Sequence, residues 1–172
     1  MDGNEENRRN VISVFNGLEP EVKTFDDVSQ EAEEVAAWVR KVIEDGINSE
    51  EIGIFVRSNS ELSRARKVAT LAGQTPLELS NRVEDRDGRL SIGAMHLAKG
   101  LEFQAVAVMA CEDNILPSQA RIETVADEDE LDEVYETERR LFYVACTRAR
   151  DRLLISGVKP ESEFFEDFLE RR

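Results

Sequence analysis

The chain has 172 residues, of which 34% are charged and 41% are hydrophobic, and its formal net charge is −15. This composition is typical of one globular domain with a real core. No apolar run reaches the roughly 18 residues that a membrane-spanning helix needs. The start of the chain also lacks the basic and then apolar pattern of a secretory leader. Two separated cysteines and one histidine argue against a zinc or other metal site, and the cysteines indicate a reduced, cytoplasmic setting.

The negative net charge, taken alone, argues against a nucleic-acid binder, because such proteins gain affinity by neutralising phosphates. The charges are unevenly distributed, however. Acidic residues cluster in 26–34 and 127–138, whereas 57–67 is locally basic. Net charge is therefore a poor guide to any one face of the molecule.

Apolar patterns predict elements that alternate along the chain. Residues 1–21 are polar and predict an N-terminal arm with a short helical turn at 10–15, followed by one domain over 22–172. Asp26 or Asp27 can cap a helix that Gly46 closes, and Ser58 or Ser60 can cap a second helix at 61–72. Short, mainly apolar runs predict strands, which are 22–25, 51–57, 75–79, 90–95 and 104–111.

The C-terminal third is predicted to contain a long loop, a helix and a strand. Residues 114–130 predict the loop, and 131–150 carry apolar side chains at steps of three and four, which indicate an amphipathic helix. Residues 152–156 are predicted to form a buried strand that ends at Gly157. A last helix is expected to pack Phe164, Phe165, Phe168 and Leu169 on the sheet.

This alternation predicts an α/β fold, a three-layer domain with a mainly parallel sheet. The nearly all-apolar run 104–111 is expected to be a central strand, covered on both faces. In such folds ligands gather at the carboxyl ends of strands, so we expect the functional residues there.

Three stretches carry polar residues that could act chemically. MHLAKGLEF at 95–103 joins two predicted strands, and it packs His96, Lys99 and Glu102 around Gly100, which suits a turn. Read without context, this stretch is an ordinary polar turn. GIFVRSN at 53–59 brings Arg57 and Asn59 to a strand end, where a plain strand end with polar neighbours is the alternative.

The third stretch is the helix at 131–150, which carries Arg139, Arg140 and, near its C-terminal end, Arg148. An arginine is favoured at a helix C-terminus by the helix dipole. The simplest interpretation of this helix is a solvated face on which arginines pair with Glu136 and Glu138.

The order of these motifs resembles the C-terminal motor domain of superfamily 1 DNA helicases of the UvrD/Rep/PcrA type, and this resemblance implies that the three-layer fold is RecA-like. HLAKGLEF resembles their motif five and ETERRLFYVACTRARDRL their motif six. GIFVRSN is similar to the strand before the point where larger relatives insert the 2B subdomain, and NILPS at 114–118 is similar to the loop after the motif-five strand. The stretch 59–88 is too short to hold that subdomain.

The resemblance implies a role in ATP hydrolysis for residues of motifs five and six. Arg148 matches the arginine that reaches the γ-phosphate, and Glu102, next to Gly100, matches the acid that binds the ribose hydroxyls. The resemblance assigns six further positions to the DNA path or to its coupling with the ATP cleft. They are His96, Lys99, Arg57, Asn59, Arg139 and Arg140.

Two features expected of a complete motor are missing from the sequence. Neither a GxxxxGK[ST] phosphate loop nor an acidic pair for Mg²⁺ is present. The resemblance therefore implies that ATP with Mg²⁺ binds only together with an N-terminal RecA-like domain, so the chain alone is expected to be inactive. It also implies that single-stranded or duplex DNA is the other partner and that unwinding runs 3′→5′. Two alternatives are a stand-alone binding module that has lost its motor half and an unrelated α/β nucleotide-binding protein.

Overall fold

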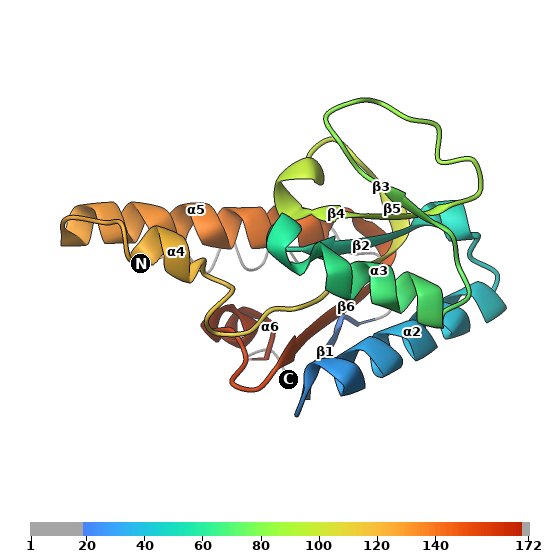
Figure 1. The fold of residues 1–172 in the computed structure, drawn as a ribbon, viewed down its shortest axis with the longest axis horizontal. Helices are drawn as coiled ribbons and strands as arrows, with labels where there is room; N and C mark the ends of the chain where they lie inside the picture. Colours follow the sequence, from blue (N-terminus) through green and yellow to red (C-terminus); the bar gives the residue numbers. More distant parts are fainter. Residues whose placement is uncertain (1–18, 170–172) are drawn as a thin grey trace.

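A computed structural model of the protein describes residues 19–169. Within this range six strands form one sheet in the order β1-β6-β5-β2-β4-β3, and all neighbours pair in parallel (Figure 1). The strands are β1 (Glu21–Phe25), β2 (Ile52–Val56), β3 (Pro76–Glu78), β4 (Leu90–Ala94), β5 (Phe103–Val108) and β6 (Ala149–Val158). The predicted parallel α/β sheet is confirmed, and β5 lies in its interior.

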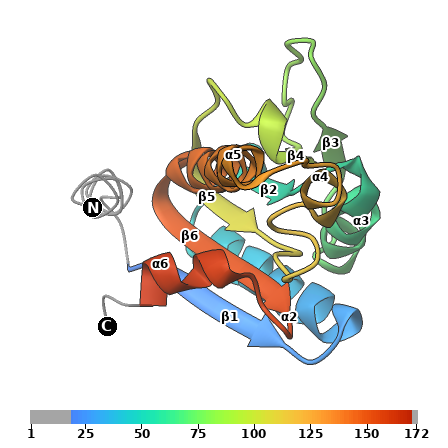
Figure 2. The same ribbon diagram turned by 90° about the vertical axis from the view of Figure 1, so that its left-hand side faces the viewer.

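Helices cover both faces of the sheet, which gives the predicted three layers. One apolar cluster joins α2 and α3 to the sheet, and a second joins α5 and the C-terminal turns to its other face (Figure 2). The helices are α2 (Val28–Glu44), α3 (Leu62–Leu71), α4 (Gln119–Ile122), α5 (Glu128–Thr147) and α6 (Glu166–Leu169), with 3₁₀ turns η1 (Ser49–Glu51), η2 (Asn59–Glu61), η3 (Met95–Leu97) and η4 (Glu163–Phe165).

Capping side chains fix where the first helices begin. The Asp27 carboxylate accepts from the Gln30 amide at 2.7 Å, so the cap is Asp27 rather than Asp26. Ser58 caps η2, and α3 follows from Leu62. The helical turn predicted at 10–15 lies outside the described residues, and the domain boundary at 21–22 stays a prediction.

The C-terminal third differs from prediction at several places. Helix α5 begins at Glu128, because the Asp127 carboxylate accepts from the Glu130 amide at 2.9 Å and starts the helix before its apolar stripe. Short helix α4 lies within the predicted loop 114–130. Strand β6 has 10 residues and is longer than the predicted strand 152–156, because its first half is polar and lacks the apolar pattern of a buried strand. The last turns bury three phenylalanines as expected, but Leu169 is 41% exposed.

A buried ion cluster joins α2 and α3 to the carboxyl edge of the sheet. The Arg64 guanidinium binds Glu112 with Nη1 and Nη2, at 2.6 and 2.9 Å, and also pairs with Glu31. Glu31 further accepts from the Ala110 amide at 3.0 Å and the Ser156 hydroxyl at 2.8 Å. Burial lowers the pKa of Arg64, but the hydrogen bond to Glu112 and the two negative charges outweigh it and raise that pKa. One cation thus holds two buried carboxylates together.

A second buried carboxylate fixes helix α5 on the sheet. Glu138 is fully buried in the middle of α5. It accepts from Arg57 Nε at 2.7 Å, just after β2, and from the Ser118 amide at 2.6 Å, just before α4. The Arg121 guanidinium lies 3.8 Å from it. The amino-terminal half of α5 projects beyond the sheet beside α4 (Figure 1), so this contact is where the helix is anchored.

Replacing Arg64 by methionine should lower the free energy of unfolding by about 3–5 kcal/mol, because two buried carboxylates lose their cation. Urea unfolding followed by circular dichroism measures this loss. The matched control is Arg66→Met, since Arg66 pairs with Glu78 at the surface and should contribute less than about 1 kcal/mol. Equal effects of the two changes would contradict the role given to the cluster.

Glu138→Gln should make local opening of α5 more frequent, and the rate at which the Cys146 thiol on this helix is labelled measures that opening. Burial raises the pKa of the Cys146 and Cys111 thiols, so both should react slowly with N-ethylmaleimide in the native chain. Leaving the Arg57 charge unpaired costs about 1–3 kcal/mol, which corresponds to roughly 5- to 150-fold faster labelling of Cys146 through local opening.

Labelling of each thiol is read by mass spectrometry of its peptide. Cys111 should change less than Cys146, because it follows β5 and is not on α5. The matched control is Glu136→Gln, whose partner Arg140 is exposed and 3.9 Å away. Faster labelling of both thiols to the same extent would indicate global destabilisation instead.

Candidate functional site

The register of the sheet places Glu102 beside Arg148. Phe103 at the start of β5 pairs with Ala149 at the start of β6, and the Phe103 amide donates to the Arg148 carbonyl at 2.9 Å. An open hollow of about 510 Å³ lies here, lined by residues 100–102 and 147–150. This is the amino edge of the sheet, so the expectation that functional residues gather at the carboxyl ends of strands is wrong for this pair.

The Arg148 guanidinium is held by neutral oxygens. Its Nε donates to the Val144 carbonyl at 3.1 Å, Nη1 to the Leu101 carbonyl at 3.4 Å, and Nη2 to the Thr147 hydroxyl at 3.2 Å. No ion pair within residues 19–169 involves this side chain. Arg148 also lies at the negative end of the α5 dipole, which favours a cation. These contacts fix the position of the guanidinium, but no carboxylate in this range neutralises its charge.

The chemistry of this hollow suits a phosphorylated ligand that also carries hydroxyl groups. A guanidinium recognises phosphate oxygens through several N–H donors, and the exposed Glu102 carboxylate accepts from hydroxyls. Gly100 has φ +81°, which confirms the turn that its backbone freedom predicted. A cation and a carboxylate thus face the same open space.

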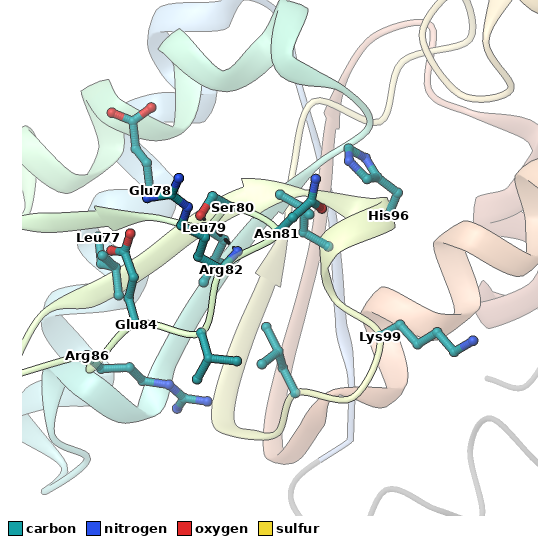
Figure 3. Close-up of a pocket in the computed structure, with 13 residues that line it drawn as sticks. Leu77, Glu78, Leu79, Ser80, Asn81, Arg82, Glu84, Arg86, His96 and Lys99 are labelled. Atoms are coloured by element: carbon teal, nitrogen blue, oxygen red, sulfur yellow. Dashed lines mark hydrogen bonds between the residues drawn. The ribbon is translucent and has the colours of Figure 1, made fainter.

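His96, Lys99 and Glu102 do not form one polar cluster, contrary to the sequence-based interpretation. Turn η3 follows β4 at the carboxyl edge, and the chain then crosses the face of the sheet to enter β5 at the amino edge. His96 and Lys99 are exposed, and Figure 3 shows their side chains pointing in different directions. A sequence cannot reveal that so short a connection spans both edges.

Arg57 and Asn59 lie at the carboxyl edge, where β2 pairs with β4. Asn59 is exposed at the start of η2. Arg57, in contrast, is only 13% exposed and is bound to Glu138. The structure therefore separates this pair from the hollow that holds Arg148.

The two arginines in the middle of α5 have different surroundings. Arg139 Nε lies 3.3 Å from the Asp167 carboxylate, and its guanidinium is 4.9 Å from the centre of the Phe164 ring. It therefore packs the C-terminal turns against α5. Arg140 is exposed, with Glu136 at 3.9 Å.

Sequence reasoning assigned no candidate site residue to the loop at 79–89. Arg86 stacks over the Phe103 ring at 4.1 Å and donates to the Glu102 carbonyl at 3.2 Å. The loop is thereby tied to the segment that leads into β5. No local pattern around Arg86 could indicate a partner so far along the chain.

Residues 19–169 contain neither a metal-binding cluster nor a helix suited to span a membrane. No group of three or more His, Cys, Asp or Glu side chains in this range is arranged to hold a metal ion. None of the helices there has the length and apolar character that a membrane crossing requires.

Similar proteins were found through both sequence and structure. Residues 61–160, more than half of the chain, match the family described as UvrD-like helicase C-terminal domain. The chain is 41% identical over 86 residues to the ATP-dependent DNA helicase UvrD1 of Mycobacterium leprae and 36% identical over 83 residues to the ATP-dependent DNA helicase Rep of Escherichia coli. These matches cover 50% and 48% of this chain but only 10% and 11% of the relatives.

Solved structures share the fold. The crystal structure of the C-terminal domain of a possible DNA helicase from Lactobacillus plantarum WCFS1 matches with a TM-score of 0.63 and 20% identity, over 92% of this chain and 87% of that one. S. tokodaii Xpd4 matches with a TM-score of 0.53 and 15% identity, over 91% and 36% of the two chains. With the sheet and the family match in agreement, the chain belongs to the UvrD-like helicase C-terminal domain family.

Proposed function

We propose that this chain forms the second wall of the ATP cleft of an ATP-dependent DNA helicase, which an N-terminal RecA-like domain completes. The observation that carries the proposal is the open hollow in which Arg148 and Glu102 lie side by side, with no carboxylate among residues 19–169 pairing the arginine. The relatives named ATP-dependent DNA helicases support it.

Within the cleft Arg148 acts on the γ-phosphate of ATP. Negative charge develops on the transferred phosphoryl group, and a guanidinium brought across the closing cleft stabilises it. Glu102 accepts hydrogen bonds from the ribose hydroxyls, and Gly100 allows the turn that presents this carboxylate. The Arg148 side chain leaves its neutral carbonyl partners when the phosphate arrives, because a charged acceptor is stronger.

The residues of the hollow fit half of a site for ATP with Mg²⁺. They supply a cation and a carboxylate, whereas the sequence holds no glycine-rich loop to cradle the phosphates. The other RecA-like domain supplies that loop and the Mg²⁺ ligands. Nucleotide binding then draws the two domains together, and hydrolysis lets them separate.

DNA follows the side of the domain that presents His96 and Lys99, both of which are exposed. Asn59 and Arg140 are also exposed and available to a strand. Arg57 and Arg139 are engaged in internal ion pairs, so they couple elements rather than bind DNA directly. The cycle of closure moves single-stranded DNA and unwinds the duplex 3′→5′, and we place the protein in the cytoplasm.

The 172-residue chain alone should not hydrolyse ATP, because its arginine has no bound nucleotide to act on without the second domain. Phosphate release in the presence of ATP, Mg²⁺ and single-stranded DNA measures this. DNA-stimulated turnover by the purified chain would contradict the proposal and would favour a complete nucleotide site within it.

In the protein with both RecA-like domains, Arg148→Ala should lower the turnover number for ATP on the order of a thousandfold or more. Nucleotide affinity should change little, since the arginine acts mainly on charge that develops in the transition state. Arg148→Lys should restore only part of the rate, because a point charge lacks the planar fork of donors.

The matched control is Lys67→Ala, which removes an exposed cation from α3, away from this hollow. Steady-state kinetics and fluorescent-nucleotide binding separate the two parameters. A rate that survives in Arg148→Ala while Lys67→Ala behaves like the unmodified protein would show that Arg148 is not the catalytic arginine.

A further inference from the structure

A second hollow lies between the loop at 79–89 and the segment that leads into β5 (Figure 3). Its volume is about 310 Å³. The segment 95–102 forms one wall, and Leu101 lines both this hollow and the one that holds Arg148. The proposed nucleotide site does not use it.

The floor is apolar and the rim is polar. Four leucines contribute the floor, namely Leu77, Leu79, Leu97 and Leu101. Ser80, Asn81 and Arg82 line the hollow from the loop and are exposed (Figure 3). A ligand with a flat apolar body and polar edges would bury its faces on the leucines and satisfy its edges on the rim.

Cations outweigh unpaired acids around the opening. Arg82 and Lys99 are exposed cations, and no ion pair within residues 19–169 involves either of them. Of the two acids that line the hollow, Glu78 is neutralised by Arg66 at 2.6 Å, which leaves Glu84. In a chain with a net charge of −15, this is a locally cationic opening that suits an anionic ligand.

The loop is fixed at its base and open at its tip, so the hollow exists before any ligand arrives. Arg86 anchors the base by stacking on Phe103 and by donating to the Glu50 carbonyl at 2.9 Å, and the Gly88 amide donates to the Glu50 carboxylate at 3.3 Å. At the tip, Val83 is fully exposed. An apolar side chain held in water above an apolar floor can close over a bound group.

We propose that this hollow binds one unstacked base of single-stranded DNA, with the phosphates on either side of the base contacting Arg82 and Lys99. The inference rests on the proposed function, which already brings the strand past His96 and Lys99. A nucleobase has two apolar faces and hydrogen-bonding edges next to an anionic backbone, which matches the floor, rim and charge of the hollow. An acidic peptide would use the cations but leave the leucine floor without a matching group.

The test uses the 172-residue chain with ¹³C-labelled methyl groups, titrated with an octamer of thymidylate and with an abasic octamer of the same charge. The thymidylate octamer should shift the methyl signals of Val83, Leu97 and Leu101, and the abasic octamer should not. Affinity for the thymidylate octamer should fall roughly tenfold or more in Arg82→Glu, because a phosphate contact becomes a repulsion.

Two variants separate the base from the phosphates. Asn81→Ala should weaken binding of thymidylate but not of the abasic octamer, because the amide contacts only the base. The matched control Lys67→Glu makes the same charge reversal on α3, away from the hollow, and should leave affinity within about twofold. Methyl spectra of each free variant confirm that it is folded.

The outcomes distinguish this inference from the proposed function. Equal shifts from both octamers, confined to the surroundings of His96 and Lys99, would overturn the base pocket but keep the DNA path. Binding of neither octamer would overturn the pocket together with the DNA-binding role. Shifts of the leucine methyls by an oligoglutamate peptide that match those of thymidylate would assign the hollow to an acidic peptide instead.

Discussion

The buried carboxylate of Glu138 determines where α5 lies, and the position of Arg148 depends on it. Glu138 joins three parts of the chain, because it binds Arg57 after β2 and the Ser118 amide before α4. Arg148 follows ten residues later, about 15 Å along the helix axis. A helix of this length is stiff, so an anchor at the carboxyl edge of the sheet also sets the place of a guanidinium at the amino edge. Burying such an ion pair is costly, and the geometry it fixes explains its presence better than stability does.

The segment 95–102 connects the two hollows physically. Leu101 is part of the leucine floor under the loop, and its carbonyl accepts from Arg148 Nη1 at 3.4 Å. The next residue is Glu102, whose carbonyl accepts from Arg86. Displacement of this segment on one side therefore changes hydrogen bonds on the other. In the proposed function, this shared wall is a short mechanical path between the DNA strand and the arginine assigned to ATP.

Much of the fold could be predicted because the apolar patterns are local. The stripe in α2 and the apolar run of β5 gave the correct element types, and Asp27 and Gly46 marked the ends of α2. The pairing of β5 with β6 is not local, however. It is this register that moves Glu102 next to Arg148 and away from His96.

The charged contacts that hold the site together could not be predicted for the same reason. Arg57 and Glu138 are 81 residues apart in the chain, and Arg64 and Glu112 are 48 apart. A sequence shows that these residues are charged, which ordinarily places them in solvent. Only the folded chain shows that Glu138 and Glu31 are fully buried and paired. The motifs could therefore be picked out as candidate site residues from the sequence, but the contacts of each residue could not.

The negative net charge is compatible with ligands that are themselves anionic, because the acidic run at 127–133 lines neither hollow. The acidic run at 127–133 begins α5 and lies on the part of this helix that projects beyond the sheet (Figure 1). There the positive end of the helix dipole stabilises the negative charges. At the opposite end of the same helix, Arg148 has no carboxylate partner within residues 19–169. Since the Debye length is about 8 Å at physiological ionic strength, exposed acids at the far end of a 20-residue helix are screened from a phosphate bound beside Arg148. The local field at each hollow, rather than the sum over the chain, therefore decides which ligand it can accept.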